Sequence, residues 1–369
     1  MDRNYMKRAL QLSKKGCALT CPNPMVGAVI VKDGRIIGEG WHHGPGLPHA
    51  EVEALRLCRE DPKGGTMYVT LEPCNHFGRT PPCTEAIINA GIAEVKIAVA
   101  DPNPRVTGGG ATRLREVGIK VETGVEQAEA REINQRFFYH CQTGRPWVIM
   151  KAAMSLDGKI ATVGGESQWI TGEKARHFVH ELRSQVAAVL VGSGTLLQDN
   201  PQLTNRLVKS GGRQPLKILL DSELQVTAQH NLVSQNPQQL IVFCTQRAVK
   251  AKIEALQGLG VKVIQQNSGA RVNLEEALAT LGAFEIQSVL VEGGSEIFAG
   301  FSMQNLLNEY YLFYAPFFIG GSQAKGVIAG TGIDTLSAAH RLWVKSTRRV
   351  GSDILLHAYK EELQACLQD

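Results

Sequence analysis

The chain has 369 residues, which is too many for one small hydrophobic core and favours two domains. Its 43% hydrophobic and 20% charged residues are typical of a globular protein, and no stretch approaches the roughly 18 apolar residues of a membrane-spanning helix. The net charge of +4, with no run of lysine or arginine, does not require a nucleic-acid partner.

The first 143 residues predict an α/β domain. Residues 1–16 have an amphipathic helical pattern and lack the long apolar core of a secretory signal. Asp33-Gly34, between two apolar runs, indicates a β-hairpin. Strand and helix patterns then alternate, which predicts a layered sheet with helices on its faces. The expected helices are 49–58, 83–91 and 108–118, and the expected strands are 65–74, 94–104 and 119–124.

A second domain is expected over residues 146–369, because the pattern breaks near residues 142–146. Strand-like apolar runs between helical segments predict another α/β fold, unrelated to the first. Residues 308–320 are almost continuously apolar, which is typical of a buried strand but leaves a homo-oligomer interface open. Eight scattered cysteines are too sparse for a disulfide scaffold, so we expect a cytoplasmic protein.

The most specific motif lies in the first domain. His49 is followed by Glu51, and Cys74 and Cys83 each follow a proline. One imidazole and two thiolates suit Zn²⁺, and three protein ligands leave a fourth position open for water, as in catalytic zinc sites. Glu51 can then carry protons without joining the metal ligands. This set of residues is typical of zinc deaminases, in which an activated water attacks an amidine-like carbon.

The spacing of the two cysteines departs from the general pattern of nucleobase deaminases. Eight residues separate Cys74 from Cys83, where that pattern has two. With the segments HAEVEAL, VTLEPCNHFGRTPPC, PNPMVGAVIVKDG and ADPNP, the chain resembles the bifunctional deaminase–reductases of riboflavin biosynthesis, called RibD in bacteria. The resemblance covers essentially the whole chain.

For the first domain, the resemblance implies a three-layer, cytidine-deaminase-like fold. The implied reaction is hydrolytic deamination of 2,5-diamino-6-ribosylamino-4(3H)-pyrimidinone 5′-phosphate. One Zn²⁺ would be held by His49, Cys74 and Cys83, with Glu51 as the proton shuttle. Five further positions match residues expected to hold the base and the ribose phosphate, namely Asn23, His42, His76, Arg79 and Asn103.

For the second domain, the resemblance implies a dihydrofolate-reductase-like α/β fold that uses NADPH to reduce the ribosyl group, giving 5-amino-6-ribitylaminouracil 5′-phosphate. The implied cofactor residues are Met154, Trp169, Thr195, Asp199, Ser222, Gly294, Ser295, Glu296, Ile297, Phe298, Ala299 and Gly300. The implied contacts to the sugar-phosphate substrate are Ser167, Arg183, Leu203, Arg206 and Glu292.

The residue types support part of this assignment independently. The segment SVLVEGG runs directly into a helical pattern, and glycines at a strand-to-helix turn suit a phosphate group. Arg183 and Arg206 carry the fork of donors that matches a phosphate. Thr245 and Arg247 could meet a 2′-phosphate, and either Lys151 or Asp199 could protonate the sugar.

Two other interpretations stay open at this point. A nucleoside or tRNA deaminase could be fused to an unrelated nucleotide-binding domain. A structural zinc could instead take a fourth ligand, for which His42, His43 and His76 are available. The partner we expect is a small phosphorylated pyrimidine, with no nucleic acid and no membrane.

Overall fold

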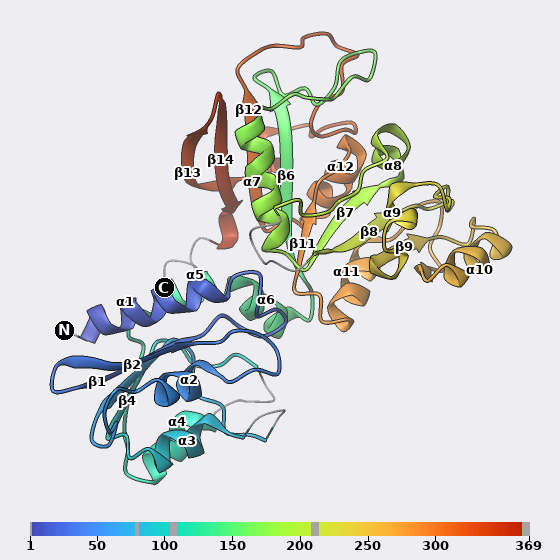
Figure 1. Ribbon diagram of the computed structural model, residues 1–369. Coiled ribbons are helices and arrows are strands. Elements are labelled where there is room, and N and C mark those ends of the chain that lie inside the picture. The colour runs from blue at the N-terminus through green and yellow to red at the C-terminus, as the bar shows by residue number, and fades with distance from the viewer. Residues whose placement is uncertain (1, 78–80, 104–108, 208–213, 364–369) are drawn as a thin grey trace. The chain divides into compact units, whose positions relative to one another are not determined.

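The computed structural model describes residues 2–77, 81–103, 109–207 and 214–363. The chain divides into two compact units between Gly144 and Arg145, and each unit has its own β-sheet (Figure 1). The predicted α/β class of both units is confirmed. Within the described ranges, no helix combines the length and the apolar character that crossing a bilayer requires.

The N-terminal unit is built on a five-stranded sheet. Its elements are α1 (Asp2–Ser13), β1 (Gly27–Lys32), β2 (Arg35–Trp41), α2 (Ala50–Arg56), β3 (Thr66–Val69), α3 (Cys83–Asn89), β4 (Glu94–Ile97), α4 (Gly110–Glu116), β5 (Lys120–Thr123), α5 (Gln127–Ile133) and α6 (Gln135–Thr143). The strand order is β2-β1-β3-β4-β5. β1 is antiparallel to both β2 and β3, whereas β3, β4 and β5 run parallel. The hairpin predicted at Asp33-Gly34 joins β1 to β2.

Helices cover both faces of this sheet. Side chains of β1 alternate between the faces, as the pleat of a strand requires. Ala28 and Ile30 join an apolar cluster with residues of α2, α3 and α4. Val29 and Val31 join a second cluster with residues of α1, α5 and α6. The unit is therefore a three-layer α/β/α structure, as predicted.

A glycine in β2 lets α2 lie directly on the sheet. A Cβ atom at Gly40 would lie 2.4 Å from the carbonyl oxygen of Ala50 and 2.4 Å from the amide nitrogen of Ala54. These distances are well inside van der Waals contact, so only glycine fits without a shift of the helix. Because α2 begins at Ala50, this contact also sets the position of His49 and Glu51.

Replacing Gly40 with alanine is therefore expected to push α2 outward. We expect a loss of about 1–3 kcal/mol in the free energy of unfolding of the N-terminal unit, as for other overpacked sites. Zinc retention after dialysis should fall with it. Gly258→Ala is the control, since a Cβ there meets nothing within 4 Å. Unchanged stability and zinc content in Gly40→Ala would contradict this account of the packing.

The C-terminal unit is built on a nine-stranded sheet. Its elements are β6 (Trp147–Ser155), α7 (Glu173–Ser184), β7 (Ala188–Gly192), α8 (Ser193–Asp199), β8 (Leu216–Leu220), α9 (Asn231–Ser234), β9 (Leu240–Cys244), α10 (Lys250–Gly258), β10 (Lys262–Gln265), α11 (Leu274–Ala283), β11 (Ser288–Val291), α12 (Ser295–Met303), β12 (Glu309–Ala315), β13 (Leu342–Val350) and β14 (Asp353–Lys360). The strand order is β10-β9-β8-β7-β11-β6-β12-β14-β13.

Seven strands of this sheet, from β10 to β12 in that order, are parallel. β14 and β13 extend it with antiparallel pairing. The main apolar cluster joins the parallel strands to α11 and α12. α7 packs on β12 and β14 through a smaller cluster. The carboxyl ends of parallel strands share one edge, which is where open α/β sheets bind ligands.

The apolar run at residues 308–320 is only partly a buried strand. β12 ends at Ala315, before Pro316, which has no N–H to donate to a neighbouring strand. Phe317 and Phe318 are 41% and 74% exposed. The interpretation of the whole run as one buried strand is therefore wrong beyond Ala315.

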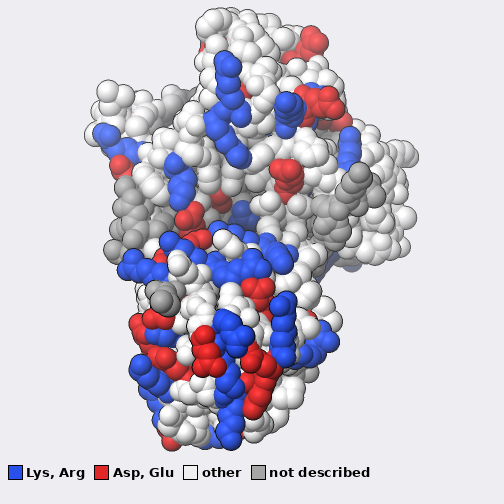
Figure 2. Space-filling view, turned by 60° about the vertical axis from the view of Figure 1, so that its left-hand side comes forward, with Lys and Arg blue, Asp and Glu red and all other residues white. Residues whose placement is uncertain are grey.

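Charged side chains of both signs share the surface of the N-terminal unit. In the lower part of Figure 2, lysine and arginine alternate with aspartate and glutamate instead of forming a field of one sign. The buried Lys96 is also paired, because its amine contacts Asp2 at 3.0 Å and Glu122 at 2.6 Å. In this lower part of the face, positive and negative side chains thus lie next to one another.

Candidate active sites

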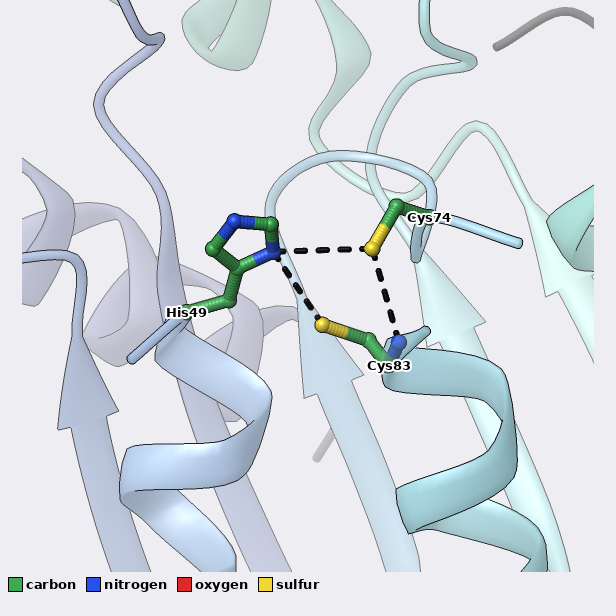
Figure 3. A group of neighbouring side chains, drawn as sticks. All are labelled: His49, Cys74 and Cys83. Atoms are coloured by element: carbon green, nitrogen blue, oxygen red, sulfur yellow. Dashed lines mark hydrogen bonds between the residues drawn. The ribbon is translucent and has the colours of Figure 1, made fainter. Parts of the chain in front are cut away.

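Three predicted zinc ligands meet at the ends of three elements. His49 immediately precedes α2, Cys83 begins α3, and Cys74 lies in the loop that follows β3 (Figure 3). His49 Nδ1 lies 3.2 Å from Cys83 Sγ and 3.5 Å from Cys74 Sγ. Tetrahedral zinc, with its usual bond lengths, separates sulfur from nitrogen by about 3.5 Å. The three side chains therefore fit a zinc ion.

The two thiols are already prepared to bind a cation. The hydrogen bond with Cys83 lowers the pKa of the Cys74 thiol, and His49 lowers it further. The same interaction with Cys74, together with burial, raises the pKa of Cys83. The backbone N–H of Cys83 also donates to Cys74 Sγ at 3.4 Å. Cys74 therefore loses its proton more readily than Cys83, and a metal ion that binds both sulfurs must displace the proton of Cys83.

The metal group has an open side. In the ranges that the structure describes, the ligand atoms that come together are those of His49, Cys74 and Cys83. His76, a potential fourth ligand of a structural zinc, is exposed. Three ligands with a vacant fourth direction are typical of a catalytic zinc site.

Glu51 lies in the first turn of α2 and is 3% exposed. Burial raises the pKa of its carboxyl group to about 7, although His49 acts against this. A carboxyl group that titrates near neutral pH can accept a proton and return it. Glu51 therefore has the properties of a proton shuttle beside the zinc ligands.

Asn23 and His42 form a hydrogen-bonded pair next to His49. The carbonyl oxygen of Pro48 can only accept, so His42 Nδ1 donates to it at 3.1 Å. Burial lowers the pKa of His42 and favours the neutral ring, whose Nε2 then accepts from Asn23 Nδ2 at 3.0 Å. The rings of His42 and His49 meet edge to face at 5.3 Å. This pairing turns the side-chain oxygen of Asn23 away from His42 and leaves it as an acceptor.

The other residues predicted to contact the deaminase substrate are His76, Arg79 and Asn103. His76 is exposed, and Arg79 lies outside the described residues. The backbone N–H of Asn103 donates to Asp101 Oδ1 at 2.9 Å. Burial raises the pKa of Asp101 to about 6, with Glu72 and Cys74 adding to the shift. Asp101 is not among the residues predicted from the sequence, where its only signal is its place in the loop after β4.

A cavity of about 1230 Å³ lies in the C-terminal unit. This exceeds the 300–1,000 Å³ of an ordinary small-molecule site, so a dinucleotide and a second ligand fit together. Its walls include residues that follow the parallel strands β7, β8 and β11. Gly294, with φ of +73°, forms the turn into α12, and the N-terminus of α12 faces the cavity.

Most predicted reductase residues line this cavity. They are Ser167, Trp169, Arg183, Thr195, Asp199, Leu203, Arg206, Ser222, Glu292, Gly294, Ser295, Glu296, Ile297, Phe298 and Gly300. Met154 and Ala299 do not belong to the lining. Met154 is 2% exposed within the apolar core cluster, and Ala299 is 5% exposed. The side chains of these two residues pack in the interior.

Arg183 and Glu292 form a buried ion pair at the cavity wall. Arg183 donates to both carboxylate oxygens, at 2.6 and 2.8 Å, and also to the carbonyl oxygen of Thr204 at 3.0 Å. Burial acts to raise the pKa of Glu292, but the guanidinium outweighs it and the pKa is lowered. Arg206 is exposed and keeps its guanidinium available, so it suits a phosphate better than Arg183 does.

Lys151 and Trp169 add a cation and an aromatic face to the same cavity. Burial lowers the pKa of Lys151, even though Glu292 lies near enough to oppose the shift. The Trp169 ring is 67% exposed and carries the Arg176 guanidinium at 4.7 Å from its centroid. Trp169 is thus not a core residue, and its indole is available to a planar ligand.

Comparison with known families covers both units. Residues 1–99 match the cytidine and deoxycytidylate deaminase zinc-binding region. Residues 146–356 match the RibD C-terminal domain. The chain thus carries a deaminase region followed by a reductase domain.

Curated relatives and solved structures match nearly the full chain. The riboflavin biosynthesis protein RibD of Actinobacillus pleuropneumoniae is 45% identical over 96% of this chain and 94% of its own length. That of Escherichia coli K12 is 41% identical over 96% and 98%.

RibD from Acinetobacter baumannii has a TM-score of 0.89, at 36% identity over 97% of this chain and 98% of its own. A diaminohydroxyphosphoribosylaminopyrimidine deaminase/5-amino-6-(5-phosphoribosylamino)uracil reductase from Thermotoga maritima has a TM-score of 0.86, at 39% identity and the same coverage. This chain belongs to the RibD family of bifunctional riboflavin biosynthesis enzymes.

Proposed function

We propose that the chain catalyses two successive steps of riboflavin biosynthesis. The first is hydrolytic deamination of 2,5-diamino-6-ribosylamino-4(3H)-pyrimidinone 5′-phosphate, by residues 1–143. The second is NADPH-dependent reduction of the ribosyl group, by residues 146–369, to give 5-amino-6-ribitylaminouracil 5′-phosphate. The observation that carries the proposal is the match of the chain, along nearly its whole length, to a Thermotoga enzyme named for this pair of activities.

In the deaminase step, His49, Cys74 and Cys83 would hold the zinc ion. When bound, zinc activates a water molecule for attack on the ring carbon that bears the 2-amino group. Glu51 takes the proton of the attacking water and returns it to the ring nitrogen. A second proton passes through Glu51 to the amino group, the C–N bond breaks, and ammonia leaves. Asn23, His42, His76, Arg79 and Asn103 would hold the base and the ribose phosphate.

In the reductase step, residues that line the large cavity would hold the cofactor. NADPH supplies the hydride for C1′ of the opened ribose. The N-terminus of α12 offers free backbone N–H groups and the positive end of the helix dipole to the pyrophosphate. Trp169, Thr195, Asp199 and Ser222 would line the cofactor, and Ser167, Leu203, Arg206 and Glu292 the sugar phosphate. Met154 and Ala299 could contribute only through the backbone.

Lys151 is the proton donor that we assign to the reduction. Lys151→Met is expected to lower reductase turnover by about 10²-fold, because it removes the ammonium group at nearly constant side-chain length. Deaminase turnover should stay within about twofold. Asp199→Asn is the comparison variant, since Asp199 is exposed at the cavity rim. A large loss in Asp199→Asn together with normal Lys151→Met turnover would reverse the assignment.

Mass spectrometry of the products tests the proposed function as a whole. The diaminopyrimidine substrate should exchange its 2-amino group for oxygen without NADPH, with one equivalent of ammonia released. Added NADPH should then add two hydrogens to the deaminated product. No mass change under either condition would refute the proposal. Cytoplasmic location, homo-oligomerisation and the lack of nucleic-acid or membrane partners stay predictions.

A further inference from the structure

Two loops of the C-terminal unit are joined at Ser222, directly after β8. In the loop after β9, the backbone N–H and the hydroxyl of Thr245 both donate to the carbonyl oxygen of Ser222, at 3.0 and 2.9 Å. In the loop before α11, the backbone N–H of Val272 donates to Ser222 Oγ at 3.2 Å. Ser222 therefore holds both loops at one place on the cavity wall.

Each of these loops carries an arginine that lines the cavity. Arg247 follows Thr245, whose hydroxyl accepts from the Arg247 backbone N–H at 3.2 Å, and Arg271 precedes Val272. Their side chains are 56% and 81% exposed. Two loops anchored at the same residue thus each bring an arginine to the cavity wall, and both side chains remain open to solvent.

Both arginines are held by carboxylates that also line the cavity. Arg247 contacts Glu223 at 2.5 Å, and Arg271 contacts Glu296 at 3.2 Å. These pairs are exposed, so they contribute little to stability, and an anion of higher charge can displace them. The two positive charges are consequently available to a ligand rather than committed to the fold.

The position of Arg271 relates this rim to the helix that would receive the pyrophosphate. Glu296 lies in the first turn of α12 and pairs with Arg271. In a dinucleotide, the adenosine ribose is attached directly to the pyrophosphate. A cofactor with its pyrophosphate at the N-terminus of α12 can therefore place that ribose beside Ser222, and its 2′ substituent toward Arg247 and Arg271.

We propose that Arg247 and Arg271, placed by Ser222, form a phosphomonoester subsite that selects the 2′-phosphate of the cofactor over a 2′-hydroxyl. Glu223 opposes this selection, because its carboxylate competes for Arg247. Thr245 acts only through its hydrogen bonds to Ser222 and Arg247, since it is fully buried. This inference rests on the proposed use of NADPH by the C-terminal unit.

The test is calorimetric binding of adenosine 2′,5′-bisphosphate and of 5′-AMP to the full-length protein. The wild type is expected to bind the bisphosphate at least about tenfold more tightly. Arg247→Ala and Arg271→Ala should each weaken bisphosphate binding by about tenfold, as expected for an exposed charged hydrogen bond. Affinity for 5′-AMP should stay within about twofold. Glu223→Gln should tighten bisphosphate binding, because it frees Arg247.

The control variant is Lys250→Ala, which also removes one positive charge. Lys250 pairs with Glu254 and does not belong to the cavity lining. A double variant of Arg247 and Arg271 that still prefers the bisphosphate would overturn the proposed subsite. Arginine variants that lose affinity for 5′-AMP by the same factor as for the bisphosphate would also overturn it.

The arginine variants could instead raise KM for the sugar-phosphate substrate and leave bisphosphate binding unchanged. This result would assign the two arginines to the substrate phosphate and would also overturn the proposed subsite. In each case, continued oxidation of NADPH by the wild type leaves the proposed function intact. Failure of that oxidation refutes the proposed function instead.

Discussion

Glu51→Gln is expected to lower deaminase turnover by about 10²–10⁴-fold, the usual contribution of a positioned general acid–base. The amide has nearly the same size and hydrogen-bonding reach as the carboxyl group, but it cannot accept a proton from water. Burial favours a neutral side chain at this position, since it raises the pKa of Glu51 to about 7. The variant should therefore fold normally and keep its metal.

Ammonia release and zinc content, measured on the same preparation, test this prediction. Glu53→Gln is a matched control on the same helix, because Glu53 pairs with Arg56 and is not part of the metal group. Reductase turnover on deaminated substrate should be unaffected in both variants. Near-normal ammonia release from Glu51→Gln with zinc retained would contradict the assignment of Glu51 as the proton shuttle.

Arg183→Met is expected to have the second-largest effect, on both stability and reduction. The Arg183 and Glu292 side chains are 14% and 8% exposed. Removing Arg183 leaves a buried carboxylate without its main counter-charge, and breaking a buried pair typically costs about 3–5 kcal/mol. Reduction should fall as well, because both residues line the cavity.

The loss of stability in Arg183→Met should depend on pH in a defined direction. In the wild type, Arg183 holds the pKa of Glu292 below its unfolded value, so the pair stabilises the fold above that value, near pH 4.3, and loses this effect as pH falls. In the variant, burial still raises the pKa of Glu292, and only the weaker effects of Lys151 and His180 oppose it. The deficit relative to wild type should thus be largest at neutral pH and shrink toward pH 5. Denaturant unfolding at pH 5 and 7.5 measures it.

A double variant separates the two roles of this ion pair. Arg183→Met combined with Glu292→Leu replaces both charges by apolar groups and should recover much of the stability. It should not recover reduction if the pair orients the sugar phosphate. A double variant with wild-type reductase turnover would show that the pair serves only the fold.

The three zinc ligands could be predicted because each belongs to a short sequence motif. His49 and Cys83 lie at the start of a helix and Cys74 lies in the loop after β3, and short motifs mark all three positions. Asn23 and His42 could both be named from the resemblance, but their pairing could not. The hydrogen bond between them depends on the loop conformation around Pro48, which the sequence does not display.

The helices and the strand that were not predicted from the sequence were missed because their hydrophobic patterns are weak. α5 and α6 bury few apolar residues, chiefly Ala130, Phe137 and Phe138, which is too short a stripe for a clear helical period. β13 is largely exposed and carries charged side chains, so it lacks the alternation of a half-buried strand. Met154 follows the lining residues Lys151, Ala152 and Ala153 on β6, but its own side chain packs in the apolar core.

The metal ligands belong to segments that are separated along the chain, so they come together only in the folded N-terminal unit. The stability of that unit should therefore depend on the concentration of free zinc. A ligand that binds only the folded state stabilises it by mass action, and each tenfold change in free zinc above the dissociation constant shifts the balance by about 1.4 kcal/mol. The C-terminal unit has its own core and contains no part of this metal group. Zinc limitation should therefore stop deamination first and leave a chain that still reduces deaminated substrate.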